Sequence, residues 1–97
     1  MAGLQYYNLE QLEEALEYYD NSIKLDPNRP EYLYHRGMAL QKSDKEEQAI
    51  DDFARALENQ NMSEAEKFQA YFNKGICLRR LGDLKNSIDD LLNATKI

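Results

Sequence analysis

The sequence is 97 residues long, with 42% hydrophobic residues, 31% charged residues and a formal net charge of −6 at pH 7. A chain of this length supports one domain, and its apolar content is too high for intrinsic disorder. The acidic balance argues against binding nucleic acid through a clustered basic face, and no apolar run approaches the roughly 20 residues of a membrane span. We therefore expect neither a nucleic-acid partner nor a membrane partner.

The apolar residues follow helical spacing along the whole chain. In the segment 9–25, leucines, a tyrosine and an isoleucine step by three or four residues, which places them on one helix face. No segment shows the sustained alternation of a β-strand. An all-α chain is therefore predicted, with helices at 2–8, 11–25, 30–42, 45–59, 64–80 and 84–96.

Local breakers and caps set these boundaries. Pro30 suits a first helical turn, where a missing amide donor costs nothing. Ser43–Glu46 and Ser63–Glu66 both have the form of a capping box, a hydroxyl followed three residues later by a carboxylate. Gly82 supplies a helix stop and Asp83 a cap for the next helix. Short turns between antiparallel helices follow from this punctuation.

The chain also repeats itself. Gly37 and Gly75 are 38 residues apart, and the same shift superposes Ile50–Asp52 on Ile88–Asp90. Gly3 and Gly37 are 34 residues apart, so the longer spacing is the shorter one plus four. A helix-turn-helix that recurs every 34 residues is the tetratricopeptide period.

On these residues the sequence resembles the tetratricopeptide repeat family, with almost three units. The matching positions are Gly3, Tyr6, Ala15, Tyr19, Ser22 and Pro27, then Gly37, Leu40, Ala49, Phe53 and Ala56, then Gly75, Leu78, Ser87, Leu91 and Ala94. The resemblance implies a right-handed superhelical solenoid of antiparallel helix-turn-helix repeats. It implies one domain over 1–97, with truncated units at 1–29 and 68–97, a unit at 30–63 and a four-residue insertion at 64–67.

Three departures from the family pattern matter. Arg36 occupies a position that is usually apolar. The insertion adds about one helical turn before the third unit. No closing helix follows the third unit, although Ile88, Leu92 and Ile97 form an apolar edge. We expect either a piece of a longer array or an edge that pairs with another copy.

The sequence offers no catalytic constellation. His35 is the only histidine, which excludes a His-based triad and a histidine-rich metal site. Cys77 falls at a packed position and is expected to be an inert thiol, and a single cysteine suits a reducing, cytoplasmic location. The acidic pairs Asp51–Asp52 and Asp89–Asp90 are interpreted as a solvated face. We predict a non-enzyme without cofactor or metal.

The resemblance implies a concave groove lined by the first helices of successive units. The implied groove residues are Tyr7, Tyr34, Met38, Gln41, Lys42, Phe72, Ile76, Arg79 and Arg80. Some of these side chains could fill the core instead, and that alternative stays open at this point. If they are exposed, the groove suits an amphipathic or extended peptide with apolar anchors and an acidic group.

One partner known for the family, the acidic C-terminal tail of heat-shock chaperones, is disfavoured. Units that hold such a tail use converging lysine, arginine and asparagine side chains. Leu4, His35, Gln69 and Asn73 stand at those positions here. The sequence therefore predicts a protein-interaction module that binds some other partner peptide or helix in its concave groove. The alternatives are a structural segment that self-associates through its open edge, and a regulatory arm of an enzyme.

Overall fold

The structure is a computed structural model that describes residues 9–96, with side chains from Gln11 onward. Residues 9–96 form five α-helices and no strand, which confirms the all-α prediction. The helices are α2 (Leu9–Leu25), α3 (Pro30–Lys42), α4 (Glu46–Leu57), α5 (Glu64–Arg80) and α6 (Leu84–Thr95). The helix expected at 2–8 lies outside the described residues.

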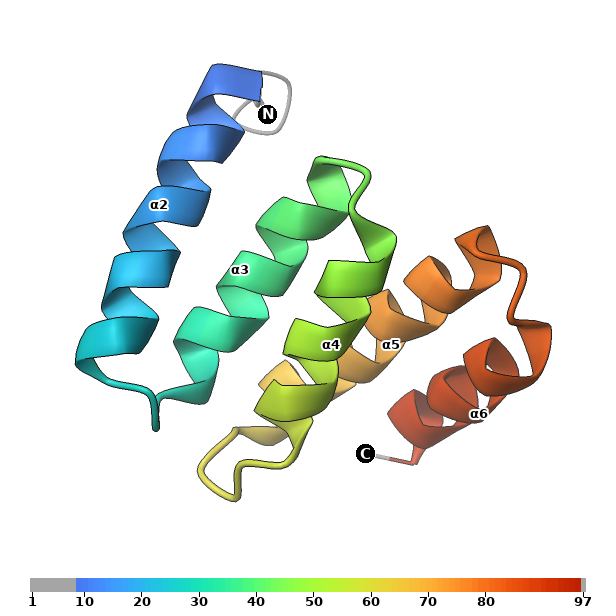
Figure 1. The fold of residues 1–97 in the computed structure, drawn as a ribbon. Coiled ribbons are helices and arrows are strands. Elements are labelled where there is room, and N and C mark those ends of the chain that lie inside the picture. The colour runs from blue at the N-terminus through green and yellow to red at the C-terminus, as the bar shows by residue number, and fades with distance from the viewer. Residues whose placement is uncertain (1–8, 97) are drawn as a thin grey trace.

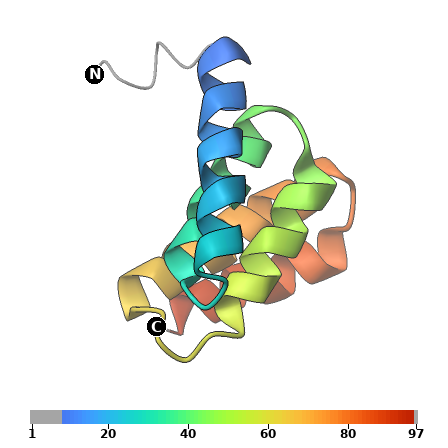
Figure 2. The ribbon, with the colours of Figure 1, turned by 60° about the vertical axis from the view of Figure 1, so that its left-hand side comes forward.

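Each described helix packs against its neighbours in the sequence and runs antiparallel to them (Figure 1). The helices α3 and α5 also touch, and no other pair of helices within residues 9–96 is in contact. Figure 2 shows that α5 and α6 are strongly rotated relative to α2, so the array twists along its length. The result places α3 and α5 as adjacent first helices of two hairpins.

Two of the predicted caps are present. The Ser63 hydroxyl accepts from the Glu66 amide at 3.2 Å, while the Glu66 carboxylate accepts from the Ser63 amide at 3.0 Å. At α6, the Asp83 carboxylate accepts from the Asn86 amide at 3.4 Å. Gly82 ends the preceding turn with φ +86°, a left-handed conformation that glycine adopts without steric cost.

The capping box predicted at Ser43–Glu46 is wrong. Ser43 is the C-cap of α3, and its hydroxyl donates to the Ala39 carbonyl one turn earlier in the helix. Asp44 then takes a left-handed φ of 60°, and Lys45 precedes α4 without a side-chain cap. Asp44 stands seven residues after Gly37, as Gly82 stands seven after Gly75, so the two turns are equivalent.

The core lies between α3, α4 and α5. Its buried members are Leu33, Tyr34, Leu40, Ala49, Phe53, Ala56, Met62, Ala70 and Cys77. Phe53 and Cys77 are the largest fully buried side chains among the described residues. A Cβ on Gly37 would lie only 2.8 Å from the Phe53 ring, so glycine is what lets this ring fill the space between α3 and α4.

Candidate functional site: the exposed face of α3 and α5

Four of the predicted groove residues line one open pocket of about 420 Å³ between α3 and α5. The lining residues are Met38, Gln41, Lys42, Asp44, Asn73 and Arg80. The α3 residues lie one turn apart along the last two turns of that helix, and the α5 residues lie two turns apart. The pocket therefore exists because the C-terminal halves of these two helices stand side by side.

An exposed aromatic pair lies further toward the start of α5. The rings of Phe68 and Phe72 stack with their centroids 6.0 Å apart and their planes at 7°. Both side chains are about two-fifths exposed, at 40% and 41%. Ile76 is half-buried one turn later, and Arg79 is exposed. Phe68 was not among the predicted groove residues, although its spacing of four from Phe72 on a helix was a usable signal.

Tyr34 does not line this surface, contrary to the sequence-based expectation. Its side chain is only 8% exposed and belongs to the core, where its ring packs against Phe53 with centroids 6.1 Å apart. Burial raises the pKa of the Tyr34 hydroxyl, and the nearby carboxylate of Glu66 adds to the rise. Glu66 belongs to the first turn of α5, so the start of this helix lies near Tyr34. Tyr7 lies outside the described residues.

The charges beside the pocket are mixed. Lys42, Arg79 and Arg80 supply three cations. Arg80 donates to Glu46 with an Nη1–Oε2 distance of 3.2 Å, and Asp44 lines the pocket wall. Because a guanidinium carries five N–H donors, Arg80 keeps others for a ligand.

The apolar edge predicted on the last helix is exposed. Ile88 is 56% and Leu92 is 53% exposed, and Leu84, one turn earlier at the start of α6, is exposed as well. Ile97 lies outside the described residues. Among the described helices, α6 packs only against α5.

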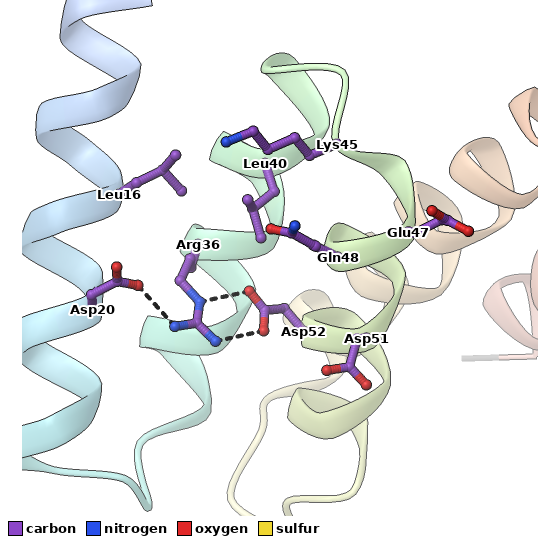
Figure 3. Close-up of a pocket in the computed structure, with 9 residues that line it drawn as sticks. All are labelled: Leu16, Asp20, Arg36, Leu40, Lys45, Glu47, Gln48, Asp51 and Asp52. Atoms are coloured by element: carbon purple, nitrogen blue, oxygen red, sulfur yellow. Dashed lines mark hydrogen bonds and ion pairs between the residues drawn. The ribbon is translucent and has the colours of Figure 1, made fainter.

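A second pocket of about 480 Å³ lies between α2 and α4, over α3 (Figure 3). Its lining residues are Leu16, Asp20, Arg36, Leu40, Lys45, Glu47, Gln48, Asp51 and Asp52. The Arg36 guanidinium at its base donates to both carboxylate oxygens of Asp52, at 2.7 and 2.8 Å, and to Asp20 at 2.9 Å. The bond to Asp52 raises the pKa of Arg36. Because Arg36, Asp52 and Asp20 use their charges and hydrogen bonds on one another, we interpret this network as structural.

This network corrects the interpretation of the acidic pairs as a solvated face. Asp51 is exposed, but Asp52 is buried beneath Arg36. Asp90 is buried at the equivalent place, and Lys74 lies 3.4 Å from its carboxylate. Arg36 and Lys74 each precede a glycine, and each lies sixteen residues before its acid. Arg36 and Lys74 therefore stand at the position that is usually apolar in the family, and each is paired with a buried aspartate.

Metal sites, membrane-spanning helices and reactive thiols were also sought in the part of the chain that the structure describes. No group of three or more histidine, cysteine, aspartate or glutamate side chains in residues 9–96 could hold a metal ion. None of the helices in this range is long and apolar enough to cross a membrane. Cys77 is fully buried, and burial raises the pKa of its thiol to about 11.

Comparison with known families decides what the hairpins are. The family model described as TPR repeat matches residues 3–44, and the one described as tetratricopeptide repeat matches residues 39–96, more than half of the chain. The chain belongs to the tetratricopeptide repeat family. No curated protein matches the sequence.

Membership in the tetratricopeptide repeat family makes the chain a helical repeat solenoid, as predicted. Repeats of this family are generally protein–protein interaction modules. The unit boundaries at 30–63 and 68–97 and the insertion at 64–67 stay predictions.

Proposed function

We propose that this tetratricopeptide repeat protein binds a segment of a partner protein along a groove formed by the exposed faces of α3 and α5. The groove consists of Met38, Gln41, Lys42, Phe72, Ile76, Arg79 and Arg80. The observation that carries the proposal is the open pocket between the two helices, with an exposed aromatic pair beside it. Aromatic residues, methionine and arginine are enriched in the buried cores of protein interfaces.

Site-specific photocrosslinking tests this proposal. A benzoylphenylalanine at position 72 should crosslink to a partner in an extract of the source cells, and the partner peptide is then identified by mass spectrometry. The matched control places the same group at Leu25, which is 87% exposed at the end of α2. A partner that crosslinks from position 72 but not from position 25 supports the groove if excess unlabelled wild-type chain abolishes the crosslink and excess Phe72→Glu/Arg80→Glu chain does not. Equal crosslinking from both positions contradicts it.

We also propose that the chain acts by binding, without catalysis or a cofactor, and in the cytoplasm. The support is chemical. Its buried charged side chains pair with one another, and its single thiol is held neutral in the core. His35 is exposed against the ring of Tyr19, with no carboxylate or nucleophile bonded to it among residues 11–96. A role as the regulatory arm of an enzyme is compatible with this binding function.

A second candidate function is self-association through α6, favoured by the exposed stripe that includes Ile88 and Leu92. Contiguous exposed apolar surface of this kind marks interaction sites. Light scattering over a concentration series should then show a mass that rises with concentration. An Ile88→Asp/Leu92→Asp variant should remain a monomer, while Leu25→Asp should behave as the wild type. A constant monomer mass for the wild type would rule this candidate out.

A further inference from the structure

We propose that the groove takes an extended peptide with an apolar anchor and an acidic side chain about four residues away. This inference rests on the proposed function, and it adds the chemistry and the spacing of the partner. It follows from the order of side chains along the groove, which runs from apolar at the start of α5 to basic at its end.

The apolar end is the stacked pair Phe68 and Phe72. The two rings lie nearly parallel, and each remains about two-fifths exposed, so together they offer one flat apolar surface. Phe68 directly follows the expected insertion at 64–67, in the second turn of α5. An aliphatic or aromatic side chain of a partner would cover this surface and remove it from water.

The basic end carries Lys42, Arg79 and Arg80. Arg79 is exposed, and its side chain makes no ion pair or hydrogen bond with another residue in the range 11–96. Glu46 pairs with Arg80 and Asp44 lines the pocket wall, whereas the Arg79 side chain is left for a ligand. In a chain with a net charge of −6, this end is therefore a local site for a carboxylate.

The stretch between the two ends favours an extended partner over a helical one. The side-chain amides of Gln41 and Asn73 line the pocket, and neither is hydrogen-bonded to another residue in the range 11–96. An amide donates and accepts, which suits the open N–H and C=O groups of an extended backbone, whereas a helix satisfies its own. Eight residues of helix separate Phe72 from Arg80, about 12 Å, and an extended peptide covers this distance in about four residues.

Selection from an unbiased peptide library tests the inference. A random dodecapeptide library displayed on phage is panned on the 97-residue chain, and enriched peptides are resynthesised for affinity measurement. We expect enriched peptides to carry an apolar side chain three to five positions from an Asp or Glu. Replacing that acid by Lys, or introducing Arg79→Glu/Arg80→Glu, should weaken binding at least tenfold. Arg29→Glu, an exposed arginine between α2 and α3, should leave the affinity unchanged.

The outcomes separate this inference from the proposed function. Peptides that need Phe72 but carry no acid at that spacing would overturn the inference and leave the groove intact as a binding site. Failure to enrich any peptide, or enrichment of peptides that bind Phe72→Ser as tightly as the wild type, would overturn both. Circular dichroism of each variant verifies its fold, which these exposed substitutions should not change.

Discussion

The Arg36 guanidinium holds the carboxylate of Asp52 through two hydrogen bonds, at 2.7 and 2.8 Å, across the hairpin of α3 and α4. Asp52 is almost completely buried, so its charge is out of water and depends on this one partner. The second hairpin has the same arrangement in a weaker form, with a single Lys74–Asp90 contact at 3.4 Å. The two pairs allow a direct comparison of a strong and a weak buried ion pair in one chain.

Asp52→Asn should lower the free energy of unfolding by about 2–4 kcal/mol, because it removes the buried carboxylate that accepts two hydrogen bonds from Arg36 and leaves the guanidinium only the exposed Asp20 as counter-charge. Urea denaturation at pH 7 measures this loss. The control is Asp51→Asn, the exposed neighbour, which should stay within about 0.5 kcal/mol of the wild type. Similar losses for the two variants would mean that the pair contributes nothing specific.

Asp90 should give the opposite pH dependence from a normal stabilising carboxylate. Burial raises its pKa, and Lys74 offsets the rise only in part. The folded state therefore binds a proton more readily than the unfolded chain, and the stability that this provides is present at low pH and is lost as pH rises through the raised pKa. Asp90→Asn should thus gain stability relative to the wild type as pH increases from about 4 to 7. A relative loss over this range would show that the Lys74 contact dominates.

Gly37→Ala should destabilise the fold by about 1–3 kcal/mol, because the new Cβ would lie 2.8 Å from the fully buried ring of Phe53. Gly75→Ala is the matched comparison. Its nearest neighbours are atoms of the half-buried Leu91 side chain at 3.0 Å, which can move more easily. The gain of about 1 kcal/mol in helix propensity should then offset most of its cost. In thermal unfolding, Gly75→Ala should melt at a clearly higher temperature than Gly37→Ala, and the reverse order would contradict the packing argument.

Cys77 should be unreactive in the folded protein. Burial raises the pKa of its thiol to about 11, so the reactive thiolate is scarce at pH 8 and shielded from reagents. Ellman's reagent at pH 8 should label the native chain no faster than the chain unfolds, and should label it at once in concentrated urea. Rapid labelling without denaturant would show that α5 opens locally.

Most of the fold was predictable because its signals are local. Pro30 opens α3, Ser63 and Glu66 cap α5, and Gly82 ends its turn, and each of these acts through residues within one helical turn. The start of α4 was predicted less well. Ser43 followed by Glu46 reads as a cap, but Asp44 accepts the left-handed conformation that its counterpart Gly82 adopts more easily.

The site was harder to predict because exposure depends on residues far apart in the sequence. Asp52 was interpreted as solvated, yet its partner Arg36 lies sixteen residues earlier. Tyr34 falls on the groove stripe of α3, but its ring packs into the core against Phe53, near the start of α5. The recurrence of a base and an acid sixteen residues apart in both hairpins was a signal for the ion pairs. No comparable signal marked Tyr34 as buried.

The position of the core has a consequence for how the molecule opens. Phe53 and Cys77 place the most deeply buried side chains on α4 and α5, while α2 and α6 each rest on one neighbour among the described helices. Local opening should therefore begin at α2 and α6 and move inward. In hydrogen exchange, the amides of α4 should be the last to lose protection, at a rate set by global unfolding.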